Sequence, residues 1–258
     1  MNKQTQIGME LLRSLSKQGD RIFPVERARI LAETLNIKSS YLNELLFHLK
    51  ENHWIHPLKK GLYALDSSML AGTPIHEYEI GTSLVNPAII SHFSAFHYHE
   101  LTDQIPHVIY ISTPKLLGDF GLLREINGVK YRFIQSKPVY FFGDVKIWVG
   151  EARISISDLE RTLLDGLRHP YFCGGFSEVL QAYKEAKNRI ELSKVIDYAF
   201  RLETSTIKRL GWILDHIGIA KKLLYQLEEA PIKGFRKLDA KGEDFGSYNR
   251  KWMIRENL

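Results

Sequence analysis

The 258-residue sequence predicts an α+β protein with two domains, and three observations lead to this prediction. Residues 1–51 carry three successive helical patterns. Two short strand-like runs joined by a basic turn follow, and they end at residue 65. Farther along, strand-like runs come first and a series of helical patterns begins after residue 158. Because strands and helices occupy separate stretches there, we expect an α+β arrangement and not an alternating parallel sheet.

Three helices are predicted in the N-terminal part. The first has apolar residues at helical spacing and ends at Gly19 and Asp20, which break the pattern. The second extends over residues 25–35. The third begins at Ser39, whose hydroxyl we expect to cap it. Its leucines recur at positions i, i+3, i+4 and i+7 and predict a buried stripe; they are Leu42, Leu45, Leu46 and Leu49.

A basic hairpin follows the third helix. Residues 54–58 and 62–65 have the composition of short strands, and Lys59, Lys60 and Gly61 form the turn between them. Three helices followed by such a hairpin are typical of a winged helix-turn-helix. We predict this domain over residues 1–66, with a larger mixed α+β domain after it.

Turn-forming residues mark the predicted boundary: Asp66, Ser67 and Ser68, then Gly72, Thr73 and Pro74. We assign residues 67–82 to a linker and connecting helix, and residues 83–258 to the C-terminal domain. Within 76–258, helical patterns cover 76–85, 92–101, 158–167, 176–187, 191–202, 205–217 and 220–229, and strand-like runs cover 108–112, 129–134 and 145–149. Residues 251–254 are a candidate final strand.

Composition narrows the class of protein. The net charge is +5, of which residues 1–66 carry +3 because they hold ten bases and seven acids. The single cysteine, Cys173, excludes a fold held by internal disulfides. The first residues lack an apolar signal core, and no apolar run reaches the roughly 18 residues of a membrane span, so we expect a cytoplasmic protein without a membrane partner.

The third helix carries the clearest functional signal. With its leucines inward, Ser40, Asn43, Glu44 and Phe47 lie on the outer face, and Lys38, Ser39 and Tyr41 lie at its N-terminal edge. A recognition helix inserts this end into the major groove of DNA, where Asn43 can pair with adenine, Ser40 with several bases and Lys38 with guanine or phosphate. Lys59 and Lys60 at the hairpin tip would contact phosphates.

The predicted DNA-binding residues are therefore Lys38, Ser39, Ser40, Tyr41, Asn43, Lys59 and Lys60. The alternative is a protein-interaction module with solvated lysines. We favour DNA binding because the charge excess and the basic tip coincide with the elements expected to face a groove. Glu44 and Glu51 count against it, since phosphate would repel both.

Two patterns suggest a metal, and we expect neither to hold one. His92, His97, His99 and His107 cluster, but their spacings of five and two place the rings on different helix faces, so structural or surface roles are favoured. Asp144 with Glu151 and Arg153 faintly resembles a metal-dependent nuclease site. However, Arg replaces the usual Lys, and strand alternation separates the acids.

No catalytic residue and no cofactor are therefore predicted, and we expect a protein that is not an enzyme. The acids of the Ser157–Glu160 stretch are explained by a capping box, in which Ser157 caps a helix and Glu160 reaches back to it.

Five stretches and two single residues, in order along most of the chain, resemble the AbiEi family of antitoxins from bacterial abortive-infection systems, which act in phage defence. They are residues 58–63 (LKKGLY), 90–96 (ISHFSAF), 156–165 (ISDLERTLLD), 174–179 (GGFSEV) and 208–214 (KRLGWIL), followed by Trp252 and Asn257. The resemblance implies a transcriptional autorepressor that binds repeated promoter sites. It also implies a C-terminal domain that counteracts a nucleotidyltransferase-like toxin, as a type IV pair without a required stable complex.

One surface is a candidate for that second activity. With Leu210, Ile213 and Leu214 inward, Lys208 and Arg209 are expected to form an exposed basic patch with Lys221 and Lys222. A solvated helix face is an equally good interpretation of these residues. Two other functions stay open: a metal-dependent nuclease with a DNA-targeting winged helix, and a regulator that senses a ligand.

Overall fold

The protein has an α+β fold in a computed structural model that describes residues 3–69, 74–118 and 121–258. The chain divides into two compact units. Unit 1 contains Met1–Leu84 and Trp148–Ile154, and unit 2 contains Val85–Ile147 and Ser155–Leu258. The predicted connecting helix corresponds to α4 (Glu77–Ser83), which belongs with unit 1. The predicted turn at Gly72 and Thr73 lies outside the described residues.

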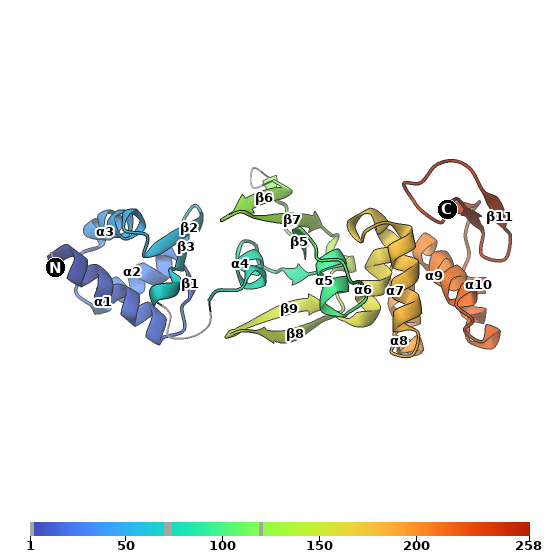
Figure 1. The fold of residues 1–258 in the computed structure, drawn as a ribbon, viewed down its shortest axis with the longest axis horizontal. Coiled ribbons are helices and arrows are strands. Elements are labelled where there is room, and N and C mark those ends of the chain that lie inside the picture. The colour runs from blue at the N-terminus through green and yellow to red at the C-terminus, as the bar shows by residue number, and fades with distance from the viewer. Residues whose placement is uncertain (1–2, 70–73, 119–120) are drawn as a thin grey trace. The chain divides into compact units, whose positions relative to one another are not determined.

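The described residues of unit 1 before Val85 include three long helices, the short α4 and a three-stranded antiparallel sheet. In chain order, its first elements are α1 (Lys3–Lys17), β1 (Ile22–Pro24), α2 (Val25–Thr34), α3 (Ser39–Glu51), β2 (Ile55–Lys59) and β3 (Leu62–Leu65). The sheet has the order β1-β3-β2 (Figure 1). The three helices and the hairpin were predicted, whereas β1 was not, because three residues are too few to show alternation.

The leucine stripe of α3 lies in the core of unit 1, as predicted. Its four leucines are at most 3% exposed and pack with Leu11, Leu12 and Leu15 of α1. The expected cap is wrong: Ser39 is the first residue of the helix, Lys38 occupies the N-cap position, and no side chain caps the end.

A mixed six-stranded sheet of order β6-β7-β5-β4-β9-β8 belongs to unit 2 except for the adjoining ends of β8 and β9, which lie in the Trp148–Ile154 segment of unit 1. Its strands are β4 (Ile89–Ile90), β5 (Val108–Thr113), β6 (Leu123–Ile126), β7 (Val129–Gln135), β8 (Asp144–Val149) and β9 (Ala152–Ser157). β5 and β7 are parallel, as are β4 and β9, while β4–β5 and β6–β7 are antiparallel. The runs predicted as strands correspond to β5, β7 and β8; β4, β6 and β9 were not anticipated.

The helices of unit 2 lie beside this sheet and beyond it (Figure 1). They are α5 (His92–Tyr98), α6 (Leu159–Arg168), α7 (Phe176–Ala186), α8 (Leu192–Phe200), α9 (Thr204–His216) and α10 (Tyr225–Glu229). Each was predicted to within a few residues, except that α10 is preceded by a separate 3-10 turn, Lys221–Leu223. A small sheet of β10 (Arg236–Lys237), β12 (Ile254–Glu256) and β11 (Ser247–Asn249) completes the unit.

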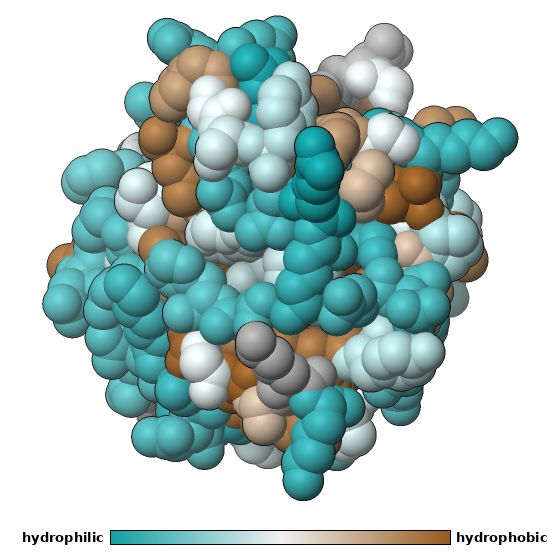
Figure 2. All heavy atoms as spheres, turned by 90° about the vertical axis from the view of Figure 1, so that its right-hand side faces the viewer, coloured by the Kyte–Doolittle hydropathy of each residue, from teal (hydrophilic) through white to brown (hydrophobic). Residues whose placement is uncertain are grey.

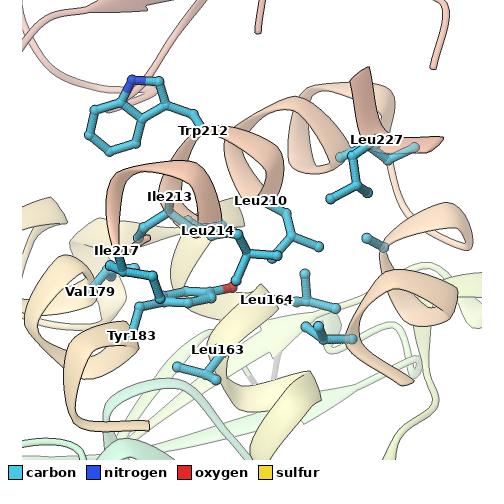
Figure 3. Packing of buried hydrophobic residues seen from close by; sticks show 14 of the residues in the cluster. Leu163, Leu164, Val179, Tyr183, Leu210, Trp212, Ile213, Leu214, Ile217 and Leu227 are labelled. Carbon is cyan, nitrogen blue, oxygen red and sulfur yellow. The ribbon is translucent and has the colours of Figure 1, made fainter. Parts of the chain in front are cut away.

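The core of unit 2 forms where α6, α7 and α9 meet. Leu163 and Leu164 of α6 lie near Val179 and Tyr183 of α7, and α9 covers them with Leu210, Ile213 and Leu214 (Figure 3). At Gly211 the ring of Trp252 packs against α9 so closely that an added Cβ would lie 2.0 Å from it. This contact joins the end of the chain to the helical core.

Seen from the end that carries α10 and β11, the surface is largely hydrophilic, with several hydrophobic patches between polar side chains (Figure 2). Phe235 and Tyr248 are exposed and make an edge-on ring contact at 4.8 Å between centroids. Across the described ranges, none of the helices combines the length and the apolar composition that crossing a membrane requires.

Candidate functional site

The outer face of α3 presents the residues that the helical pattern placed there. Ser40, Asn43 and Phe47 are exposed, as are Lys38 and Ser39 at the start of the helix. Tyr41 differs from the prediction: it is half-buried and packs against the core of unit 1. The side chains available at the N-terminal end of α3 are therefore small and polar, apart from Lys38.

The two lysines of the hairpin have different surroundings. Both are exposed, but Lys59 Nζ donates a hydrogen bond of 2.7 Å to the carbonyl oxygen of Leu84. Lys60 lies in the turn beside Gly61, which has a φ of +73°, in the left-handed region that favours glycine. Lys60 is thus the cation at the tip of the hairpin. Lys59 instead links the hairpin to Leu84, which follows α4.

The predicted basic patch on α9 is wrong. Lys208 and Arg209 are 2% and 7% exposed, because α9 is buried at every position from Thr206 to Leu214. Lys208 Nζ donates to the carbonyl oxygen of Leu227 at 3.1 Å, and Arg209 Nε donates to that of Lys237 at 3.0 Å. Both cations hold neighbouring segments to α9. Lys222 is exposed, and the side chain of Lys221 lies outside the described part of the chain.

The acids of the nuclease hypothesis lie apart. Asp144 is the first residue of β8, whereas Glu151 follows the end of that strand. At a strand rise of about 3.3 Å per residue, roughly 16–20 Å separates them. Glu151 instead forms an ion pair with Arg21 at 3.4 Å. The two carboxylates therefore do not make one metal site.

The histidines do not form a metal site within the described ranges either, where no suitable group of His, Cys, Asp and Glu occurs. His97 and His107 are exposed, and His99 Nε2 makes a hydrogen bond of 2.7 Å with the carbonyl oxygen of Ser157. His92, in contrast, is buried at the start of α5.

A buried network of charges extends along α6. The helix is capped by Asp158, not by Ser157 as predicted: Asp158 Oδ1 accepts from the backbone N–H of Arg161 at 2.8 Å. Glu160 does not complete a capping box, since its carboxylate binds Lys194 at 2.8 Å and accepts from the backbone N–H of Glu191. The acids of this stretch are thus bound within unit 2.

Arg161 and Asp165 form the centre of this network. Their side chains are 5% and 2% exposed, and Arg161 Nη2 lies 2.9 Å from Asp165 Oδ1. Arg161 also donates to the carbonyl oxygens of Tyr140, at 2.7 Å, and Phe142. Burial opposes the charged form of Asp165, but the Arg161 guanidinium, together with other nearby groups that include Arg168, outweighs it and lowers the pKa of Asp165 to about 2.

One turn farther along α6, Arg168 lies 3.7 Å from Asp165 and binds Glu203 through two hydrogen bonds of 3.0 and 2.9 Å. This paired geometry is typical of a strong arginine–carboxylate interaction. Arg168 therefore ties α6 to the N-terminus of α9.

A cavity of about 210 Å³ opens beside this network, entirely within unit 2. Among the residues that line it are Lys137, Tyr140, Arg161, Asp165, Arg168, His169, Glu203 and His92. Three of these side chains are cationic and two are carboxylates, so the lining carries one excess positive charge if both imidazoles are neutral.

Both imidazoles are neutral at pH 7. Burial lowers the pKa of His92 to about 3 and that of His169 to about 4. The two rings are nearly parallel, at 30°, with centroids 5.8 Å apart.

His92 is the most unusual residue of the cavity. It is 2% exposed, and its φ of +52° is a left-handed conformation that costs a residue with a side chain about 1–3 kcal/mol. Its Nδ1 lies 2.9 Å from Ser91 Oγ, whereas its Nε2 is buried and makes no hydrogen bond with any described residue. An unsatisfied buried polar atom costs about 1–3 kcal/mol. Strain and a missing partner at one side chain are typical of a functional position.

Sequence reasoning assigned His92 a structural or surface role and did not anticipate this cavity. The lining comes from the start of α5, the ends of β5 and β7, the segment before β8, α6 with the residue after it, and the residue before α9, which lie far apart in the chain. Two of the stretches singled out in the sequence, 90–96 and 156–165, contain His92, Arg161 and Asp165, and the fold brings these three residues to one cavity.

No family model matches the sequence, and no curated protein is detectably similar to it. A structural counterpart exists. The crystal structure of the RV2827C protein from Mycobacterium tuberculosis is similar in fold, with a TM-score of 0.70 over 96% of this chain and 90% of that chain. The two sequences are 12% identical, so the similarity concerns the fold alone.

Proposed function

We propose that this chain is an AbiEi-like antitoxin that represses its own operon. Unit 1 binds repeated promoter sites, and unit 2 counteracts a nucleotidyltransferase-like toxin, which is a functional partner and not a required stable ligand. The single observation that carries the DNA-binding part is the exposed polar end of α3 next to a basic hairpin. Such a role belongs in the cytoplasm, where promoter DNA is found.

The order of elements in unit 1 supports this proposal. Unit 1 begins with a helix, a strand, two helices and a two-stranded hairpin, which is the order of elements in a winged helix. In that arrangement α3 is the recognition helix and the turn at Lys60 is the tip of the wing. Lys38, Ser39, Ser40 and Asn43 are exposed together where such a helix meets base edges. Tyr41 is better assigned to the core, and Lys59 to positioning of the hairpin.

We predict that Asn43→Ala and Lys60→Ala weaken promoter binding in different ways. Asn43 contacts a base edge, so its loss should cost about 1–3 kcal/mol on the specific site and little on random DNA. Lys60 contacts phosphate, so its loss should weaken binding to all DNA and lower the slope of log affinity against log salt by about 1. Fluorescence anisotropy with promoter and scrambled duplexes at several salt concentrations measures both effects.

Lys184→Ala is the matched control, because Lys184 is an exposed lysine on α7 in unit 2. It should leave promoter affinity and salt slope unchanged. If Asn43→Ala lost the same affinity for promoter and for random DNA, Asn43 would not take part in base recognition. If neither unit 1 variant changed the affinity, DNA binding through α3 and the hairpin would be contradicted.

A second prediction concerns the division of labour. The double variant Asn43→Ala/Lys60→Ala should lose repression of a promoter reporter and still protect cells that express the proposed partner toxin. Both residues are exposed, so the variant should keep the wild-type protein level, which a blot checks. A folded, abundant variant that fails to protect would show that the DNA-binding face takes part in neutralisation.

The buried state of Lys208 and Arg209 removes them from the proposed antitoxin surface, since their cations are bound by backbone carbonyls. A second candidate function, a ligand-sensing regulator, is favoured by one observation: the cavity of unit 2 contains the strained and incompletely bonded His92.

A further inference from the structure

We propose that the cavity lined by His92, Lys137 and Arg168 binds the phosphate group of a small ligand, either inorganic phosphate or a phosphate monoester. This is a site of unit 2 and does not depend on DNA binding or on toxin neutralisation.

The first support is the hydrogen bonding of His92. The hydroxyls of Ser112 and Ser91 lie 2.8 Å apart, and Ser91 Oγ lies 2.9 Å from His92 Nδ1. The proposed site requires the tautomer in which Ser112 donates to Ser91, Ser91 donates to Nδ1, and Nε2 carries the proton, and both distances are compatible with it. Nε2–H is then a donor without an acceptor, at a residue that lines the cavity. A phosphate oxygen would supply that acceptor.

The second support is charge. Among the cations of the lining, Arg161 is held by Asp165 and by two backbone carbonyls, and Arg168 by Glu203. Lys137 is exposed and forms no ion pair with any carboxylate in the described ranges; its ammonium lies 5.9 Å from the centre of the Tyr140 ring. The excess positive charge of the cavity is therefore available at Lys137, which is a suitable partner for a phosphate.

The other ligand classes fit less well. A metal ion would meet two arginines and a lysine in the lining, and the part of the chain that the structure describes holds no group of His, Cys, Asp and Glu suited to a metal. A neutral apolar molecule would leave His92 Nε2 and Lys137 without partners, which makes its binding unfavourable. A phosphate accepts hydrogen bonds from both.

Size limits the ligand further. Pockets for drug-sized ligands have volumes of about 300–1,000 Å³. At about 210 Å³, this cavity has room for a phosphate group with a small substituent or ordered water. The remainder of a nucleotide would have to extend from its opening.

The test is isothermal titration of the full-length protein with inorganic phosphate and, separately, with adenosine monophosphate, at constant ionic strength set with chloride. We expect saturable binding with a dissociation constant of about 1 mM or lower for at least one of them. Similar affinities would indicate recognition of the phosphate group alone, and tighter binding of the nucleotide would indicate a monoester; either result supports the site. No saturable binding of either probe up to about 20 mM would overturn it.

Variants locate the binding in this cavity. Lys137→Ala removes an exposed side chain without disturbing packing, and His92→Phe keeps a ring but removes Nε2–H. Each should weaken binding by about tenfold or more, while Lys184→Ala on α7 should not change it. Long-range ¹H–¹⁵N spectra of the wild type should show the His92 Nε2 signal shifting as phosphate is added. Wild-type affinity in folded Lys137→Ala, or an unshifted His92 signal at saturation, would contradict the proposal even if His92→Phe does not fold.

Discussion

The stability of the protein should fall steeply between pH 6.5 and pH 4 as acid is added. In the unfolded chain, His92 and His169 take up protons near their ordinary pKa of 6.5. In the folded protein, burial lowers their pKa values to about 3 for His92 and about 4 for His169, so His92 stays mostly neutral over this range and His169 takes up its proton only near its lower end. The unfolded state then binds up to two more protons than the folded state, and the free energy of unfolding should drop by up to about 2.7 kcal/mol per pH unit.

Acidic residues add to this loss only near its lower end, because the hydrogen bonds that Glu160, Glu203 and Glu256 accept outweigh the effect of burial and lower their pKa values from the ordinary 4.5. Asp165, with a folded pKa of about 2, contributes stability that is present above its ordinary pKa of 3.8 and is lost only below it. Burial also lowers the pKa of His99, which adds a loss of the same sign below pH 6.5. Urea unfolding of the full-length protein in buffers without phosphate, from pH 7 to pH 4.5, measures the slope.

Replacing one buried histidine should reduce that slope by about 1.4 kcal/mol per pH unit, since one titrating group is removed. His92→Phe is the variant, and His107→Gln, at an exposed position, is its control and should keep the wild-type slope. A stability that stays constant from pH 7 to pH 4.5 would show that the two rings are not held neutral.

The second large effect is expected for Asp165→Ala. This substitution leaves the Arg161 guanidinium, whose side chain is 5% exposed, without its carboxylate, and Arg168 loses a neighbouring opposite charge at 3.7 Å. Breaking a buried pair by removing one partner destabilises a protein by about 3–5 kcal/mol. Chemical denaturation at pH 7 measures the loss, and the melting temperature should fall with it.

Glu51→Ala is the matched control, because Glu51 forms an exposed ion pair with Lys50 at 3.8 Å. Its loss should cost less than about 1 kcal/mol. If Asp165→Ala were no more destabilising than Glu51→Ala, the network along α6 would not contribute to the stability of unit 2.

The sequence by itself determined the local elements and the outward face of α3. A strong helical period predicts which face of a helix is buried without any tertiary information. In α3 the leucines are buried, and Ser40 and Asn43 are exposed, as predicted. Short strands such as β1 and β4 were missed because two or three residues show no period. The mixed α+β organisation followed from the order of the longer elements.

Only the tertiary structure decided which charged residues are surface residues. Periodicity assigns one buried face to a helix, but α9 is buried at every position from Thr206 to Leu214. The side chains of Lys208 and Arg209 therefore donate hydrogen bonds to backbone carbonyls of α10 and β10 and are not solvated. The cavity is the same kind of result, because segments distant in sequence bring Arg161 and Asp165 beside His92. Burial and neighbouring charges determine whether these groups are protonated. Burial and neighbouring charges arise from tertiary packing, so the order of residues along the chain does not reveal them.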